Sequence, residues 1–293
     1  MFADFEHQNS FDEKGYTCFR IISINEVEKL RSIYAKYESA HNQSREKFRG
    51  TGWVNDSEII NALTKEVGYI LNSFLGKFFT NHQILGYNFL LKENGLDTEV
   101  LPHQDWTYVD ETRFYSLNIW IALEDTEVAN GTLFVVPGSQ KIFKGYLRPA
   151  PEYPIPFLNE RQDLKKISVP VTLKAGECIC FNNRTIHGSY SNHSQSNRLA
   201  IVATIYPKGA ELLHHYVHDK THPETVTEYK ITPMDFLSIS RGQPPQNHLS
   251  KMIVQTKYPK MTFWDLKLKW IAFYLISKFY RKFRQLTESF SSL

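Results

Sequence analysis

The sequence predicts a mainly β protein with flanking helices, folded as a double-stranded β-helix, that is, a jelly-roll or cupin-like barrel. Two observations predict this class. From residue 84 to residue 206, short segments with strand periodicity follow one another, separated by turns. Up to residue 79, apolar residues instead recur every three or four positions, as in amphipathic helices. Many short strands favour two sheets that close over a central cavity, with the early helices outside.

Two helices are expected ahead of the strands. Residues 1–15 read as a tail and residues 17–22 as a short strand. Ser23 and Glu26 have the spacing of a capping box, so the first helix begins there. The second helix is expected over about residues 57–79, where a second apolar stripe runs at helical spacing. Both helices are expected to pack on the outside of a sheet.

The strands follow from residue 84 onward. They are expected at residues 84–92, 116–124, 132–136, 168–173, 177–181 and 198–206. In the second of these, apolar residues alternate with Asn118 and Trp120, which would point into the barrel if the apolar face packs on the helices. Residues 141–166 contain four prolines and predict a long loop of the kind that often forms lids or binding segments. Residues 207–262 show a mixed pattern.

His103 and Asp105 are separated by a single residue. In an extended segment their side chains project to the same side, and Gln104 points away. An imidazole and a carboxylate placed in this way can take two adjacent positions on one metal ion. His187, just past the predicted strand 177–181, is the candidate third ligand and would complete the two-His-one-carboxylate set of non-haem iron oxygenases. Taken alone, the His103–Asp105 pair also fits a solvated polar loop.

These segments together resemble the phytanoyl-CoA dioxygenase family of Fe(II)- and 2-oxoglutarate-dependent oxygenases. The resemblance covers about residues 10–207 and is specific as a set. The matching motifs, in order, are FDEKGY at 11–16, HQD at 103–105, WIALE at 120–124, NGTL at 130–133 leading to PGS at 137–139, HGS at 187–189, and Arg198.

The resemblance implies Fe(II) as the metal, 2-oxoglutarate as the cosubstrate and dioxygen as the oxidant. It makes His103, Asp105 and His187 the catalytic metal ligands. The function that it implies is hydroxylation of an aliphatic C–H bond in a small organic substrate, whether a lipid or acyl compound, an amino acid or a secondary metabolite. Asp105 favours hydroxylation over halogenation, because the related halogenases carry a small residue at that position. The alternative is a non-catalytic jelly-roll protein that binds metal or is recruited to membranes as a scaffold.

The resemblance also implies a cosubstrate site. Arg198 would bind the distal carboxylate of 2-oxoglutarate, since a guanidinium matches a carboxylate bidentately, and the hydroxyl of Ser189 would assist it. Trp120 and Asn118 are candidates for the wall of this pocket, although core packing is the alternative for Trp120. The resemblance also implies that a Lys near position 92 can contact the cosubstrate, but a solvated position is the favoured interpretation for Lys92. Loops at about residues 108–115 and 141–166 are expected to contact the substrate.

Composition narrows the cellular setting. The formal net charge is only +3, which does not argue for nucleic acid as a partner. Cys18, Cys178 and Cys180 are the only cysteines, and we expect buried free thiols in a reducing compartment. With no secretory leader or long apolar run at hand, a cytoplasmic protein is expected. His214, His215 and His218 are expected to be exposed to solvent, and a second metal site is the alternative for them.

The last segment has a different character. Residues 1–262 are assigned to the oxygenase domain, and residues 263–293 to a basic amphipathic helix. Between residues 265 and 288 this helix carries six basic and two acidic side chains, a net charge of +4. The favoured interpretation is that 263–290 pack on the domain or on a second copy of the chain. The alternative is peripheral contact with an anionic membrane surface.

Overall fold

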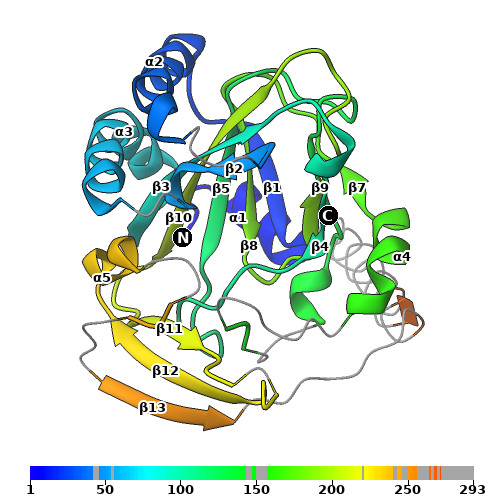
Figure 1. Ribbon diagram of the computed structural model, residues 1–293. Coiled ribbons are helices and arrows are strands. Elements are labelled where there is room, and N and C mark those ends of the chain that lie inside the picture. The colour runs from blue at the N-terminus through cyan, green and yellow to red at the C-terminus, as the bar shows by residue number, and fades with distance from the viewer. Residues whose placement is uncertain are drawn as a thin grey trace, which may run out of the picture.

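Two antiparallel sheets face each other in the protein (Figure 1). The larger one has, in spatial order, strands β1 (Tyr16–Arg20), β8 (Glu177–Asn182), β5 (Leu117–Ala122), β10 (Arg198–Pro207), β3 (His82–Lys92) and β2 (Phe48–Gly50). The smaller one has the order β4 (Val100–His103), β9 (His187–Ser189), β6 (Leu133–Val135) and β7 (Val169–Pro170). The predicted jelly roll is confirmed, although neither sheet closes into a hydrogen-bonded barrel among the described residues.

The computed structural model describes most of the chain. It covers residues 1–41, 46–53, 56–142, 147–149, 157–219, 221–239, 243–245 and 250–255, together with Trp264, Lys267, Leu268 and Ile271. The predicted C-terminal helix at 263–290 therefore lies almost entirely outside the described residues. Among the helices that are described, none is long and apolar enough to cross a membrane.

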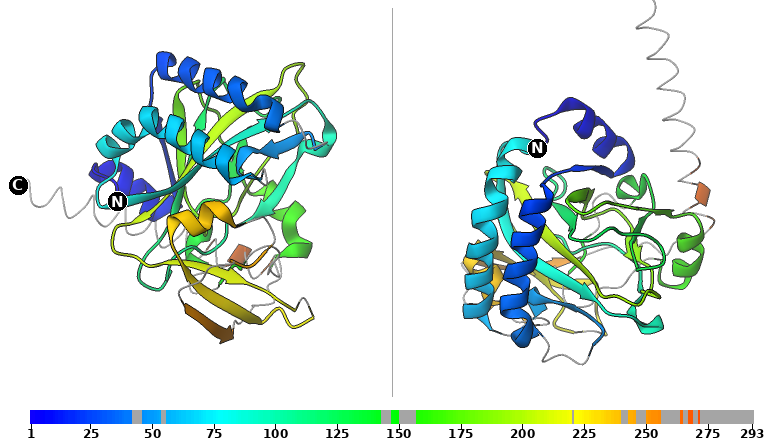
Figure 2. Two further views of the ribbon diagram at one scale, coloured as in Figure 1. Left: turned by 60° about the vertical axis from the view of Figure 1, so that its left-hand side comes forward. Right: turned by 90° about the horizontal axis from the view of Figure 1, so that it is seen from above.

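Two long helices cover the outer face of the larger sheet. They are α2 (Ile24–His41) and α3 (Ser57–Phe78), which run side by side in Figures 1 and 2. Asp56 caps α3 by accepting the backbone N–H groups of Glu58 and Ile59. Both helices match the predicted segments. Their buried stripes share one core with the apolar face of β5, where Ile119 and Ile121 are fully buried.

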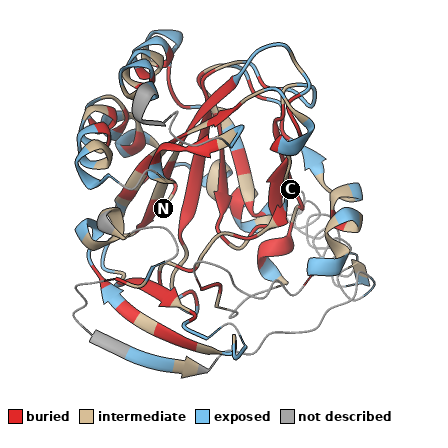
Figure 3. Ribbon diagram, in the orientation of Figure 1, coloured by how far each residue is buried: buried red, intermediate tan, exposed pale blue. Residues whose placement is uncertain are grey.

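The opposite face of β5 looks into the space between the sheets. Trp120 and Ala122 pack there with Val135 of β6 and Phe181 of β8. The central strands of the larger sheet are therefore buried on both faces, and many exposed residues lie on the outer helices and loops (Figure 3). The alternation in residues 116–124 predicted this division, and β5 confirms it.

The amino terminus departs from the prediction. Residues 1–15 form a helix, α1 (Phe5–Lys14), instead of a tail. Asp4 caps its first turn and the buried Phe11 packs on Phe2, with ring centroids 5.1 Å apart. Gly15 ends the helix at a φ of 84°, and its carbonyl accepts the Thr185 hydroxyl at 2.9 Å. The helix has too few apolar residues for helical periodicity to reveal it, and it anchors the turn before His187.

A third sheet extends below the jelly roll. It has the order β11 (Leu212–Tyr216), β12 (Thr225–Ile231) and β13 (Ser250–Gln255), with α5 (Pro233–Ser238) between the last two strands. The predicted loop 141–166 ends in a short helix, α4 (Arg161–Lys166), and the strand predicted at 168–173 shrinks to β7. In the described part of the chain, four 3-10 turns complete the elements, at Thr51–Trp53, Leu96–Thr98, Ser139–Lys141 and Leu158–Glu160.

The cysteines are free thiols, as predicted. Cys178 and Cys180 are buried on one face of β8 with their sulfur atoms 3.8 Å apart. Cys18, by contrast, is exposed. The prediction that it is buried is wrong because β1 is an edge strand of the larger sheet.

Candidate metal centre and cosubstrate site

Adjacent strands bring His103 and His187 together. His103 is the last residue of β4, and His187 is the first residue of β9 and its partner in the register. Asp105 follows two residues after His103, where the chain leaves the strand, and its backbone N–H donates to the carbonyl of Asn183 at 2.9 Å. Side chains far apart in the sequence thus meet at the end of the smaller sheet.

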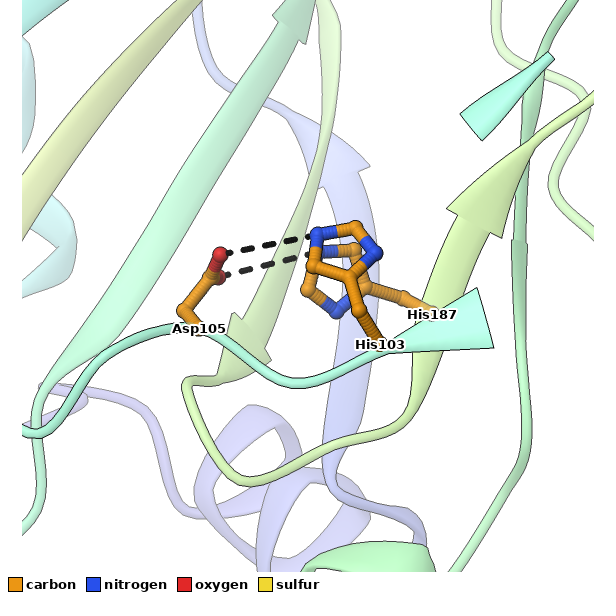
Figure 4. A group of neighbouring side chains, drawn as sticks. All are labelled: His103, Asp105 and His187. Atoms are coloured by element: carbon orange, nitrogen blue, oxygen red, sulfur yellow. Dashed lines mark ion pairs between the residues drawn. The ribbon is translucent and has the colours of Figure 1, made fainter. Parts of the chain in front are cut away.

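These three side chains converge on one point (Figure 4). Nε2 of His103 lies 3.9 Å from Oδ1 of Asp105, and Nε2 of His187 lies 3.6 Å from Oδ2 of the same carboxylate. One potential ligand atom from each residue lies within 4.8 Å of the others. A group of two imidazoles and one carboxylate at this spacing can hold a metal ion that prefers nitrogen and oxygen ligands.

The imidazoles are oriented for ligation. Nδ1 of His103 bonds the carbonyl of Leu101 at 2.9 Å, and Nδ1 of His187 bonds the carbonyl of Thr185 at 2.9 Å. A carbonyl only accepts, so in each ring Nδ1 carries the proton and Nε2 keeps its lone pair for a metal. Burial and the nearby His187 lower the pKa of His103 to about 4, so its ring is neutral at physiological pH.

Asp105 is held from the larger sheet. Asn118 on β5 donates from Nδ2 to Oδ2 of Asp105 at 2.6 Å, and the hydroxyl of Thr204 on β10 donates to Oδ1 of Asn118. Gln104 points away from the cluster, as predicted, and donates to the carbonyl of Arg184. The predicted inward direction of Asn118 is confirmed, and the side chain that it reaches is the metal-ligand candidate.

A second cluster lies beside the first. Ser189 follows His187 by two residues on β9, so both side chains project to the same side of the strand. Arg198 opens β10 opposite Lys92 at the end of β3. Its side chain is 1% exposed, and within the described part of the chain its Nε and Nη1 atoms have no hydrogen-bond partner.

The expectation that Lys92 is solvated is wrong. It is 0% exposed, and its Nζ donates to the Ser189 hydroxyl and to the carbonyl of Tyr190, both at 2.6 Å. Burial, with Arg198 nearby, lowers the pKa of Lys92 to about 6. Burial likewise lowers the pKa of Arg198 to about 10. Lys92, at the end of β3, reaches Ser189 on β9 of the smaller sheet. The apolar strand before Lys92 in the sequence could not indicate this long-range contact.

This second cluster fits a carboxylate ligand. Two buried basic side chains, Arg198 and Lys92, stand side by side, and no carboxylate in the described part of the chain forms an ion pair with either of them. A buried guanidinium with unused donors needs a partner, and a bidentate carboxylate supplies one. Trp120 forms a wall of the site, since the Arg198 guanidinium lies 5.1 Å from its ring centroid. Trp120 therefore packs in the core and borders the site as well.

Two of the three histidines near residue 215 are not at the surface, whereas His218 is exposed, as expected. His214 is 5% exposed and His215 is 2% exposed, so the expectation that they are solvated is wrong. They lie on β11, which passes along the segment after Asp105, where Leu213 N–H donates to the Tyr108 carbonyl at 2.8 Å. His215 bonds Glu228 at 2.9 Å, and His218 bonds the Tyr229 hydroxyl at 2.9 Å. Among the described residues they add no ligand to a metal group.

A buried ion pair supports the segment that carries Asp105. Nη2 of Arg148 lies 2.6 Å from Oε1 of Glu111, and these side chains are 2% and 4% exposed. Nε of Arg148 also donates to the backbone carbonyl of Asp105 at 2.5 Å. This pair could not be predicted from the sequence, because its partners come from two loops in which no periodicity applies.

Comparison with known proteins places these features in a family. The sequence model described as phytanoyl-CoA dioxygenase matches residues 11–200. A phytanoyl-CoA dioxygenase of Arabidopsis thaliana is 31% identical over 147 residues, which are 44% of this chain and 48% of that protein. A phytanoyl-CoA dioxygenase domain-containing protein 1 of Danio rerio is 32% identical over 124 residues, 40% of this chain and 43% of that protein. The matched region thus spans a little under half the length of these relatives.

Solved structures share the fold at low sequence identity. The non-heme alpha-ketoglutarate-dependent carbocyclase SnoK from nogalamycin biosynthesis aligns with a TM-score of 0.51 and 20% identity, over 86% of this chain and 96% of that one. EvdO2 from Micromonospora carbonacea var. aurantiaca, solved with 2-oxoglutarate, aligns with a TM-score of 0.51 and 18% identity, over 75% and 96% of the two chains. These likenesses support the jelly-roll assignment.

Proposed function

The chain belongs to the phytanoyl-CoA dioxygenase family, and from that premise we propose that it is a hydroxylase that uses Fe(II), 2-oxoglutarate and dioxygen. Its substrate is a small organic molecule with an aliphatic C–H bond. The observation that carries the proposal is that one short strand, β9, supplies both sites. His187 belongs to the group of metal-ligand candidates, and Ser189 belongs to the cluster of buried basic side chains, since it accepts a hydrogen bond from Lys92.

Each residue has a distinct task in this proposal. His103, Asp105 and His187 hold the metal and leave part of its coordination sphere to small molecules. Fe(II), when bound there with 2-oxoglutarate, supplies the oxidising chemistry that activates dioxygen. Arg198, with Ser189 beside it, holds the distal carboxylate of the cosubstrate. That carboxylate neutralises charge which the fold has already buried.

Lys92 joins the clamp. It donates to Ser189 and faces Arg198 across the strand pair, so a carboxylate bound there lies beside both basic side chains and favours the protonated form of Lys92. Trp120 covers one side of the guanidinium and keeps water away from it. A water-poor site strengthens each of these charged hydrogen bonds, since the effective dielectric constant falls with burial.

The substrate belongs to one of three classes: lipid or acyl compounds, amino acids, or secondary metabolites. The segment 108–115 is the contact surface that we propose for it, together with the loop 141–166. The first of these segments follows directly after Asp105, and Arg148 in the second bonds the Asp105 carbonyl. The start of the first segment and Arg148 of the second are therefore next to the metal site.

Succinate formation tests this function. Purified protein with Fe(II), ascorbate and 2-oxoglutarate should release succinate under air, slowly without substrate and faster with extracts that contain one. Products are then identified by comparing cells with and without the gene. A protein that binds metal but never converts 2-oxoglutarate, with any extract, would instead be a non-catalytic metal-binding module.

A further inference from the structure

Asp105 stands apart from the other two ligand candidates because it lies outside regular structure. His103 and His187 are strand residues paired with each other, whereas residues 104–108 are in neither helix nor strand. A carboxylate on an irregular segment has freedom that a metal site must remove, and bonds from neighbouring groups commonly supply the restraint. The contacts of the Asp105 side chain therefore matter for metal binding.

We propose that Asn118 and Thr204 are positioning residues that fix the Asp105 carboxylate for the metal. Nδ2 of Asn118 donates to Oδ2 of Asp105 at 2.6 Å, and the Thr204 hydroxyl donates to Oδ1 of the same amide. A carboxylate can only accept, so the NH₂ group of Asn118 must face it. The hydroxyl then bonds the remaining carbonyl oxygen, and the two contacts together specify one orientation of the amide.

Both residues sit on a rigid platform. Asn118 lies on β5 and Thr204 on β10, directly opposite each other in the register, so their side chains leave the same face of the larger sheet. Asn118 is 8% exposed. These two hydrogen bonds thus connect the irregular segment that follows β4 to β5 and β10, the two central strands of the larger sheet.

This role differs from cosubstrate binding, which the family resemblance suggested for Asn118. The polar groups of its amide are already directed at Asp105 and Thr204. The inference rests on the proposed metal site, and the two roles separate in experiment. A positioning residue changes the affinity for metal when no cosubstrate is present. A cosubstrate contact changes only the affinity for 2-oxoglutarate.

The test is anaerobic titration with Fe(II) alone, without 2-oxoglutarate, of the full chain and of four variants. Asn118→Leu should weaken metal binding about 10- to 100-fold, the range found for groups that orient metal ligands. Thr204→Val removes the hydroxyl at nearly constant shape and should weaken Fe(II) binding by a smaller factor. Thr204→Ser keeps the hydroxyl and should restore the affinity. Arg198→Ala should leave the affinity for Fe(II) unchanged and weaken only the binding of 2-oxoglutarate.

A matched control guards against general damage to the sheet. Thr17 on β1 is also a buried threonine of the larger sheet, and its hydroxyl bonds Nδ1 of His7 at 3.3 Å. It pairs with Cys180, whose side chain lies in the core on the helix side of the sheet, so Thr17 faces away from the metal site. Thr17→Val should leave Fe(II) affinity unchanged. The inference is overturned if Asn118→Leu, folded as judged by circular dichroism, binds Fe(II) as tightly as the unchanged protein. If the unchanged protein binds no Fe(II), the metal site itself fails, and this inference fails with it.

Discussion

At the scale of single residues, the cosubstrate site is defined by basic side chains that the fold buries without an ion-pair partner among the described residues. Arg198 is the clearest case, since a fully buried guanidinium with unused donors is costly unless a ligand completes it. The apolar run that follows Arg198 in the sequence predicted its burial. The buried state of Lys92 required the pairing of β3 with β10, which no local pattern contains.

Replacing Arg198 tests its role as the carboxylate partner. Arg198→Ala should raise the apparent KM for 2-oxoglutarate by a factor of tens or more, because a buried charge pair with one partner removed costs about 2–5 kcal/mol. Steady-state succinate assays measure it. Arg20→Ala, which replaces a half-exposed surface arginine, is the matched control and should leave the KM for 2-oxoglutarate unchanged. An unchanged KM in Arg198→Ala would assign the carboxylate to another cation.

When 2-oxoglutarate binds, the amine of Lys92 should take up a proton from solution. The pKa of Lys92 is lowered to about 6 in the free protein, so its amine is largely neutral at pH 7.5. A carboxylate bound beside it favours the charged form and raises this pKa, and the protein then gains a proton. Below pH 6 the amine is already charged, so the uptake should vanish. Calorimetry in buffers of different ionisation enthalpy measures it, and Lys92→Met should show none. Equal uptake in that variant would contradict the assignment.

At the scale of elements, the long helices and central strands were predictable because each has a buried stripe or alternating face. The third sheet was not predicted: β11 holds Leu212, His214 and Tyr216 on one face, and histidines there resembled a polar loop. Helix α1 was missed because a single buried residue, Phe11, anchors it. Contacts between loops, such as Arg148 with Glu111, leave no pattern in a sequence at all.

The Arg148–Glu111 pair should matter for stability. Glu111→Gln keeps the shape but leaves a buried guanidinium uncompensated, which should lower the free energy of unfolding by about 3–5 kcal/mol. Glu211→Gln breaks the exposed pair of Glu211 with Lys230 and should change it by less than about 1 kcal/mol. Urea denaturation followed by tryptophan fluorescence gives both values. A loss of similar size in the two variants would show that the buried pair has no special weight.

At the scale of the whole molecule, the role of residues 263–293 stays a prediction, because they lie almost entirely outside the described residues. We expect them to pack on the domain or on a second copy. Their deletion should then lower the melting temperature or change the oligomeric state, and the full chain should not sediment with vesicles. Four net charges near an anionic surface would contribute roughly 4 kcal/mol. Sedimentation with anionic but not neutral vesicles at low salt, lost on deletion, would support membrane contact instead.

The metal centre joined to its cosubstrate clamp is the central claim, and anaerobic visible absorption tests it most directly. Protein with one equivalent of Fe(II) should develop a weak charge-transfer band when 2-oxoglutarate is added, because the band requires both to occupy one site. Asp105→Ala removes a metal ligand and should abolish the band. Absence of the band in the unchanged protein, or its persistence in Asp105→Ala, would contradict the assignment of His103, Asp105 and His187 as the iron site.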